Sequence, residues 1–297
     1  MNELSRILIA YDGSAFSDAA LNDLRRAGLP MSLEAVVLTV ADIILPPPDE
    51  SLTADDVPAI RIPEIERHAQ AHAQKTIKEA RAFAERAAKR VKSDFPGWDV
   101  RVEVSCDAPA WAVIKMADRD NPGLILVGSH GHSLVGGRLI LGSVSQRVLH
   151  EVSCSVRVAR CWDVRRKGPV RIVIGFNGTP DSELAVAAVA ARAWPEGSEA
   201  RVITSRDRLE SARHGVAAER LRAVGLTTTD VSREGDPAHV LIKEAEEWGA
   251  DSIFVGTRDI HGFQHLLHGS VSSAVAARAE CSVEVVRGEK HGLNPKV

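Results

Sequence analysis

The sequence predicts an α/β fold: two tandem, doubly wound, parallel five-stranded sheets of the Rossmann-like type. Two observations predict it. Short apolar segments alternate with helical segments along the chain, and the whole series of segments occurs twice. Strands that alternate with helices form right-handed crossovers, which produce parallel sheets. The length of 297 residues is also that of about two domains.

Six pairs of segments recur in the same order, which indicates an internal duplication. The pairs are 6–14 with 171–179, 38–42 with 203–207, 107–110 with 235–238, 126–130 with 254–258, 141–145 with 268–272, and 151–160 with 279–287. The offset is 165 at Asp12 and Asn177 but 128 at Gly128 and Gly256, so the first copy holds 37 extra residues (165 − 128). We expect a first domain at 1–160, a linker at 161–169, a second domain at 170–287 and a tail at 288–297.

The first copy shows five strand-like segments, at 7–11, 35–40, 100–104, 124–127 and 155–159. They are apolar without strict alternation, as in a sheet that is buried on both faces. Helices are expected at 17–27, which Gly28 follows, and at 65–91, 110–119 and 143–151. The helix at 65–91 alternates charges, which favours a solvated face. The 37 extra residues include Pro46–Pro48 and favour a surface excursion over a lid.

The composition excludes several classes of function. There are 37 Lys and Arg against 40 Asp and Glu, so the net charge of −3 predicts no nucleic-acid partner. The longest apolar run, at 184–191, is far shorter than the roughly 20 residues of a membrane span. The N-terminus lacks the pattern of a signal peptide, and four cysteines match no metal or redox motif. A cytoplasmic protein is expected.

Several polar and glycine residues follow the predicted strands of the first copy. Asp12 and Val40 end the first and second strands, and Gly128 follows the fourth. Gly142 and Ser143 open a helix, whose free N–H groups and dipole attract anions. Ligands of parallel sheets bind beyond these strand ends, so a phosphate site is expected there. The chain contains no G-x-x-x-x-G-K-[ST], G-x-G-x-x-G, H-E-x-x-H or G-x-S-x-G motif.

Each half resembles the universal stress protein domain, whose nucleotide pattern is G-x2-G-x9-G-[ST]. In the first copy, Gly128 and Gly131 are followed by ten residues, one more than the pattern, and then by Gly142-Ser143-Val144-Ser145. The resemblance implies ATP binding, with the adenosine at Asp12 and the backbone of Val40. The implied ATP site comprises Ala10, Asp12, Val40, Gly128, His130, Gly131, Arg138, Gly142, Ser143, Val144 and Ser145.

The second copy departs from the pattern and predicts a weaker site. Asn177 replaces the aspartate, Ser205 replaces Val40, and Asp259 replaces the second glycine. A carboxylate about 4 Å from a phosphate charge costs about 1 kcal/mol in water and about 4 kcal/mol at an effective dielectric of 20. A bridging Mg²⁺ would reverse that sign. The second candidate site comprises Asn177, Ser205, Gly256, Asp259, Gly269, Ser270 and Ser272.

Other reactive side chains are expected to have ordinary roles. The pairs His68/His72 and His261/His265, with His268 nearby, have helical spacing but lack a complementary carboxylate or cysteine, so we expect no metal site. Cys154 and Cys281 precede the last strand of each copy and are expected to be buried structural thiols.

The leading hypothesis is a nucleotide-binding stress-response regulator or sensor without strong catalysis. A slow Mg²⁺-dependent ATPase and a nucleotide-free scaffold are the alternatives. By the same resemblance, the last strands at 155–159 and 282–286 pair with each other, which predicts an intramolecular pseudo-twofold dimer. Further assembly into a homodimer is left open.

Overall fold

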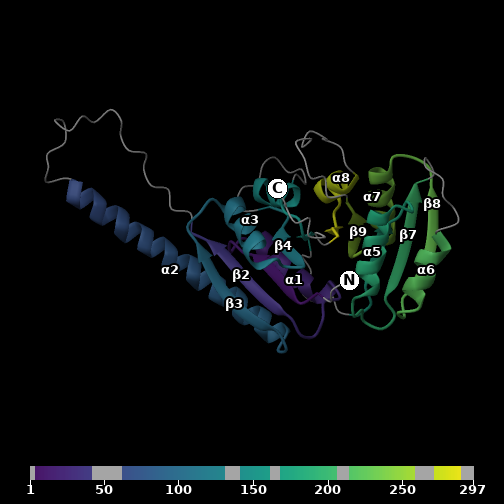
Figure 1. Ribbon diagram of the computed structural model, residues 1–297, viewed down its shortest axis with the longest axis horizontal. Helices are drawn as coiled ribbons and strands as arrows, with labels where there is room; N and C mark the ends of the chain where they lie inside the picture. The colour runs from purple at the N-terminus through teal and green to yellow at the C-terminus, as the bar shows by residue number, and fades with distance from the viewer. Residues whose placement is uncertain are drawn as a thin grey trace, which may run out of the picture.

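The computed structural model describes residues 4–41, 62–130, 141–160, 168–205, 214–257 and 271–288, with the backbone alone at 62–69 and 214. Both halves consist of strands alternating with helices (Figure 1). The elements of the first half are β1 (Arg6–Ala10), α1 (Ala15–Asp23), η1 (Leu24–Arg26), β2 (Glu34–Val40), α2 (Ile62–Asp94), β3 (Asp99–Ser105), α3 (Pro109–Asp120), β4 (Leu124–Gly128), α4 (Ser143–Glu151) and β5 (Ser155–Ala159). Those of the second half are β6 (Arg171–Gly175), α5 (Pro180–Ala190), β7 (Glu199–Ser205), α6 (His214–Arg222), β8 (Thr227–Arg233), α7 (Pro237–Trp248), β9 (Ser252–Gly256), α8 (Val271–Arg278) and β10 (Ser282–Val286).

The strands join into one ten-stranded sheet with the order β3-β2-β1-β4-β5-β10-β9-β6-β7-β8. Pairing is parallel within each half, and β5 pairs with β10 in antiparallel fashion. The predicted α/β class, the five strands in each copy and the pseudo-twofold junction through the last strands are therefore confirmed. The two predicted sheets are continuous across that junction.

Local sequence explains where the helices begin and end. The hydroxyl of Ser14 accepts a hydrogen bond from the N–H of Ser17 and so caps α1. The segment predicted as one helix to residue 27 changes to a 3₁₀ turn at Leu24, and Gly28 then adopts a φ of +63°. Pro109 fits the first turn of α3 because its missing N–H would be unpaired there.

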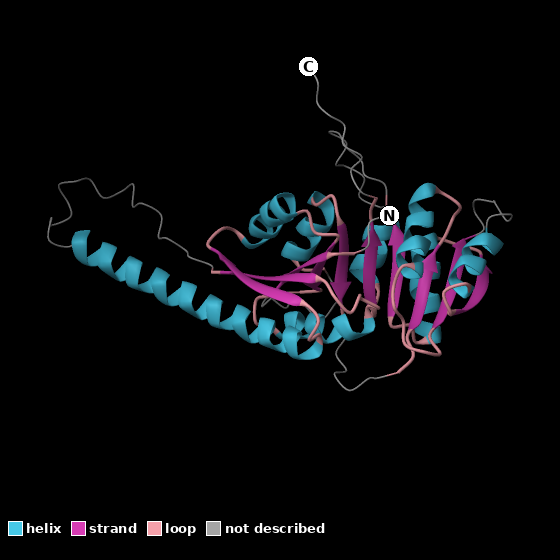
Figure 2. Ribbon diagram, turned by 60° about the horizontal axis from the view of Figure 1, so that its bottom comes forward, coloured by secondary structure: helices cyan, strands magenta, loops and turns pink. Residues whose placement is uncertain are grey.

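Helix α2 differs from the expectation of a solvated helix. One face of its C-terminal half is buried against the sheet through Ala80, Ala84, Ala87 and Val91. Its N-terminal end projects past the sheet, as Figures 1 and 2 show. The charged residues occupy the other faces, so the charge pattern identified the solvent side and missed the alanine stripe. The predicted surface excursion at Pro46–Pro48 lies outside the described residues.

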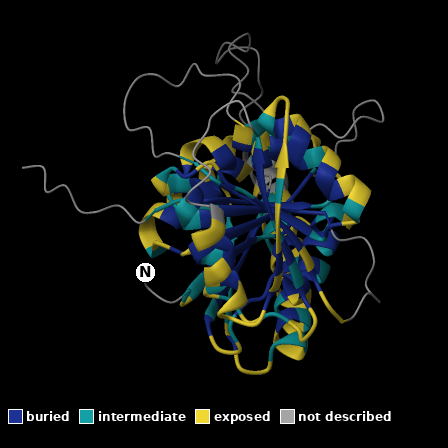
Figure 3. Ribbon diagram, turned by 90° about the vertical axis from the view of Figure 1, so that its right-hand side faces the viewer, coloured by how far each residue is buried: buried dark blue, intermediate teal, exposed yellow. Residues whose placement is uncertain are grey.

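Helices cover both faces of the sheet, which is the most deeply buried part of the chain (Figures 2 and 3). On the face of α3, α4, α7 and α8, one apolar core is continuous across both halves. On the opposite face, α1 and α2 cover one core and α5 and α6 cover another. The junction between the halves is therefore apolar on one face only. No helix in the described part of the chain is long and apolar enough to span a bilayer.

Candidate functional site

A cavity of about 600 Å³ lies beyond the C-terminal ends of β1, β2 and β4. Its walls come from these strand ends, from α2 and α3, and from the first turn of α4. The described residues that line it are Ala10, Tyr11, Asp12, Ser17, Leu38, Thr39, Val40, Ala41, Thr76, Glu79, Ala80, Phe83, Pro109, Val113, Val127, Gly128, His130, Gly142, Ser143, Val144 and Ser145. Every described residue of the first predicted site is among them. The remaining two, Gly131 and Arg138, lie outside the described residues, as does His132.

Asp12 is exposed and follows β1 directly. Its Oδ1 accepts a hydrogen bond from the N–H of Ser14 at 3.0 Å, which closes the turn into α1. Asn177 does the same in the second half, where its Oδ1 accepts from the N–H of Thr179 at 3.2 Å. The turn therefore accepts aspartate or asparagine, and the negative charge is what distinguishes the first half.

Gly128 is required by packing. A Cβ atom there would lie 2.9 Å from the carbonyl oxygen of Phe16 in the first turn of α1. At Gly256 a Cβ would lie 1.8 Å from the carbonyl oxygen of Asp181 in α5. Both glycines let a helix cross close to the end of a strand. Retention of Gly256 in the second copy therefore carries no information about a ligand there.

The first turn of α4 borders the cavity with its N-terminal end. Its N-cap is Gly142, which has no side chain to cap the helix, whereas Ser14 caps α1 and Thr179 caps α5. The first N–H groups of a helix have no partner within it. Gly142 itself donates its N–H to the carbonyl of Ser129 at 2.8 Å. The first turn of α4 thus presents N–H groups and the positive end of the helix dipole at the cavity.

The two serines of this turn differ. Ser143 is exposed, whereas Ser145 is buried and its hydroxyl donates to the carbonyl of Gly128 at 2.6 Å. Ser145 thereby ties α4 to the end of β4. In this arrangement its hydroxyl proton is not directed at a ligand, and Ser143 is the better placed hydroxyl.

His130 is half-buried and its ring contacts the ring of Phe16 in a tilted arrangement, with ring centroids 4.9 Å apart. Burial lowers the pKa of His130, and the nearby charge of Arg160 lowers it further. The imidazole is therefore neutral at pH 7. Among the described lining residues there is no lysine or arginine, while Asp12 and Glu79 carry negative charge. Backbone N–H groups and the helix dipole are the anion-attracting features that the described wall offers.

Several residues that line the cavity were not predicted from the sequence. Tyr11 donates its hydroxyl to Asp18 at 2.9 Å, and burial together with this hydrogen bond raises the pKa of Tyr11 to about 12. Thr39 is 2% exposed, and its hydroxyl has no hydrogen-bond partner. Glu79 and Phe83 belong to α2. The position of Thr39 near the C-terminal end of a predicted strand was the one available signal. No local sequence pattern places α2 across the cavity.

The second predicted site is only partly described, because Asp259, Gly269 and Ser270 lie outside the described residues. Asn177 is exposed, and Ser272 is buried. The hydroxyl of Ser205 donates to the carbonyl of Gly235 at 2.5 Å. The side chain that replaces Val40 is thus engaged with its own half.

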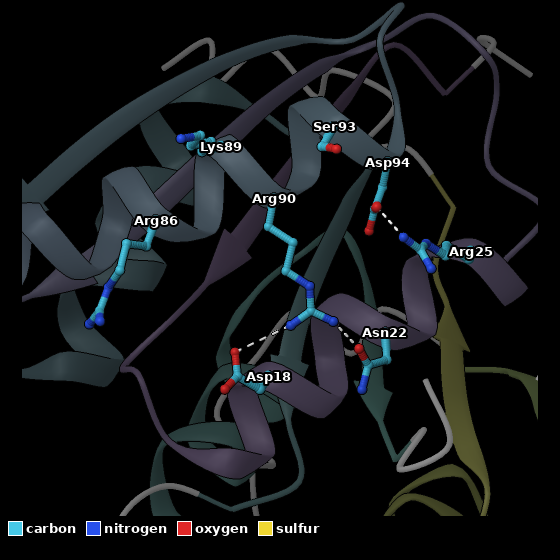
Figure 4. Close-up of a pocket in the computed structure, with 8 residues that line it drawn as sticks. All are labelled: Asp18, Asn22, Arg25, Arg86, Lys89, Arg90, Ser93 and Asp94. Carbon is cyan, nitrogen blue, oxygen red and sulfur yellow. Dashed lines mark hydrogen bonds and ion pairs between the residues drawn. The ribbon is translucent and has the colours of Figure 1, made fainter. Parts of the chain in front are cut away.

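A second hollow, of about 640 Å³, lies on the surface between α1 and α2 (Figure 4). Four of its charged groups form ion pairs or hydrogen bonds with its other lining residues: Arg90 contacts Asp18 and Asn22, and Arg25 contacts Asp94. These are surface ion pairs that link two helices, and they make a poorer candidate than the cavity at the strand ends.

No group of three potential ligands among the described His, Cys, Asp and Glu residues could hold a metal ion. His261, His265 and His268 lie outside the described residues, as does the side chain of His68. Cys154 and Cys281 are half-buried free thiols, and burial raises the pKa of Cys281 to about 12.

Residues 3–160 and 180–287 match the universal stress protein family. The chain is 30% identical over 303 residues to a universal stress protein of Mycobacterium tuberculosis, covering 95% of this chain and 96% of that protein. The crystal structure of a universal stress protein from Archaeoglobus fulgidus covers 98% of both chains, with a TM-score of 0.62 and 18% identity. A family protein from Arabidopsis thaliana with AMP bound covers 43% of this chain and 97% of its own, with a TM-score of 0.32 and 14% identity.

Proposed function

The chain belongs to the universal stress protein family, and from that premise we propose that its first half binds ATP in the cavity at the strand ends. The chain then acts as a cytoplasmic stress-response regulator whose conformation or partners depend on the bound nucleotide. The solved family protein with AMP bound supports an adenine nucleotide as the ligand class. The cavity volume of about 600 Å³ suits a ligand of this size.

One observation carries the proposal: the cavity joins apolar strand ends to the N-terminus of a helix that lacks a side-chain cap. Leu38, Val40 and Val113 offer an apolar wall for a base. The N–H groups of the first turn of α4 offer donors to phosphate oxygens. The unpartnered hydroxyl of Thr39 is a buried polar atom that a ligand would satisfy.

The charge at the site bears on the form of the ligand. Asp12 and Glu79 are negative, so a bare triphosphate would be repelled. Bound Mg²⁺ would offset this charge, with most of its ligands coming from phosphates and water. We therefore propose Mg²⁺-ATP as the bound form, and we assign no binding to the second half.

Titration calorimetry of the full chain with Mg²⁺-ATP tests the proposal, using the variants Asp12→Asn and Asn177→Asp. Asp12→Asn removes the charge but keeps the turn, because Asn177 forms the same turn. We expect Asp12 to accept a hydrogen bond from the adenosine part of the ligand. A hydrogen bond to a charged group contributes about 1.5–3 kcal/mol, so the affinity should fall about tenfold or more. Asn177→Asp is the matched control and should leave the affinity unchanged.

We expect one nucleotide per chain. A wild-type chain that binds no ATP would support the scaffold alternative and overturn the proposal. Full affinity and stoichiometry in Asp12→Asn would remove Asp12 from the site. Multiple turnovers of ATP that depend on Ser143 would instead favour the ATPase alternative.

A further inference from the structure

The two halves meet at the pairing of β5 with β10, which we call the seam. Arg157 lies directly opposite Glu284 at its centre. The two residues are also equivalent positions of the duplicated sequence, which is offset there by 127 residues (284 − 157). The Arg157–Glu284 pair therefore lies on the pseudo-twofold axis, where a position faces its own equivalent. A seam between two identical halves would place like charges at this point.

On the face of the sheet that α1 and α5 cover, the seam contains buried charged side chains. Arg157 and Glu284 are 0% and 1% exposed, and Nη1 of the arginine lies 3.3 Å from Oε2 of the glutamate. The same guanidinium donates to Asp23 of α1 at 3.0 Å. From the other half, Arg192 binds Glu284 and donates to the carbonyl of Ala27.

A second buried ion pair crosses between the halves on the same side. Nη2 of Arg26 lies 2.7 Å from Oδ2 of Asp251, and the two side chains are 5% and 4% exposed. The equivalent positions are Ala191 and Gly123, neither of which is charged. This pair exists once and joins unlike halves.

The ion-paired side chains that the two halves contribute to the seam carry net charges of opposite sign. The first half contributes Asp23, Arg26 and Arg157, and the second contributes Arg192, Asp251 and Glu284. Two arginines and one aspartate sum to +1, whereas one arginine and two carboxylates sum to −1. We propose that this charge difference determines which halves pair at the seam. A first half pairs with a second half, and its pairing with the first half of another chain is disfavoured.

The contacts of Arg160 and Arg287, which follow β5 and β10, do not discriminate. Arg160 donates to the carbonyl of Cys281, and its equivalent Arg287 donates to the carbonyl of Cys154, which is the equivalent of Cys281. These contacts recur in any pairing because both halves carry the arginine. The valines at the seam are likewise shared, and they lie in the continuous core.

A seam between two first halves would bury Arg157 against Arg157 and leave Arg26 facing Gly123 in place of Asp251. A seam between two second halves would bury Glu284 against Glu284. In the first case Arg26 would be buried without its carboxylate, which is strongly destabilising. In both cases like charges would lie directly opposite each other in the sheet and repel. Specificity here comes from rejection of the wrong partner as well as attraction of the right one.

The test uses two full-length variants that break the charge balance in opposite directions. Asp251→Arg gives the ion-paired seam residues of both halves a net charge of +1, and Arg26→Asp gives those of both halves a net charge of −1. In each variant alone, the two halves should no longer pair at the seam. When the two variants are mixed, each half of one chain can pair with a half of opposite net charge from the other chain. We expect a one-to-one complex when the variants, one carrying a size tag, are refolded together from urea and examined by native mass spectrometry. A tagged and an untagged wild-type chain refolded together should form less of the mixed complex, because each chain closes its own seam.

The double variant Arg26→Asp/Asp251→Arg provides a second measurement within one chain. It should recover at least half of the loss in urea midpoint that the single variants show. Lys243→Glu places like charges at an exposed pair outside the seam and should leave the midpoint unchanged. The proposal is overturned if mixing yields no more complex than wild type, or if the double variant is no more stable than the worse single variant.

Discussion

Replacing Thr39 with valine should stabilise the ligand-free protein and weaken its binding of ATP. The Thr39 side chain is 2% exposed, and its hydroxyl has no hydrogen-bond partner. A buried hydroxyl without a hydrogen-bond partner lowers the free energy of unfolding by about 1–3 kcal/mol. Valine has nearly the same shape and no polar atom, so the free energy of unfolding should rise by about that amount. The melting temperature should rise by roughly 2–4 °C for each kcal/mol.

The second half supplies the control. Thr204 occupies the equivalent position, is 4% exposed, and has an interaction partner. Thr204→Val should therefore destabilise the chain by about 1 kcal/mol, because a satisfied hydroxyl is lost. The same substitution in the same structural position thus has opposite signs in the two halves.

Urea denaturation followed by circular dichroism measures both variants, and calorimetry measures their affinity for Mg²⁺-ATP. A Thr39→Val protein that is no more stable than wild type would refute the reasoning about the unpartnered hydroxyl. Increased stability with unchanged affinity would show that the ligand does not use this hydroxyl. Weaker binding by Thr204→Val alone would assign the nucleotide to the second half.

Three further outcomes are expected. Gly128→Ala and Gly256→Ala should each cost about 1–3 kcal/mol of unfolding free energy, with the larger loss at Gly256, where the added Cβ lies closer to a backbone oxygen; chemical denaturation would contradict this if both variants matched wild type. Because the pKa of His130 is lowered in the folded chain, the unfolded chain binds more protons, so its contribution to stability is complete above about pH 6.5 and is lost as the pH falls below that value. His130→Gln should therefore flatten the acid side of the stability profile, and an unchanged profile would count against it. Since burial raises the pKa of Cys281 to about 12, this thiol should resist alkylation at pH 8 while the exposed Cys106 reacts, which peptide mapping by mass spectrometry would check.

The fold could be predicted because its signals are local and duplicated. The predicted helix at 143–151 and the predicted strand at 155–159 have the same limits as α4 and β5. The first strand was displaced by one residue, from 7–11 to Arg6–Ala10, because the polar Arg6 pairs in the sheet through its backbone. Helix α2 was predicted too short at both ends, although Pro63 in its first turn and Pro96-Gly97 after its last residue are signals for its limits.

The site could be predicted where it follows from strand ends. Parallel strands present their C-terminal ends at one edge, so Asp12, Val40 and Gly128 converge on one cavity although they are distant in sequence. The wall from α2 could not be predicted, because the angle at which a helix crosses a sheet depends on packing rather than on its own pattern. The packing constraint on Gly128 could not be predicted either, because it comes from the backbone of Phe16, which no sequence spacing reveals. Its place in a nucleotide site stays a prediction.

The duplicated motif therefore contains two kinds of position that the sequence alone does not separate. Gly128 and Gly256 serve helix crossing, and Asp12 and Asn177 close equivalent turns, so these features persist whether or not a ligand is bound. The ligand-facing differences are elsewhere. Val40 is replaced by Ser205, whose hydroxyl donates to the carbonyl of Gly235 in its own half. Since scaffold positions are retained while cavity positions differ, loss of binding in one half need not cost that half its fold. The second half can then specialise as the charge-matched partner of the first.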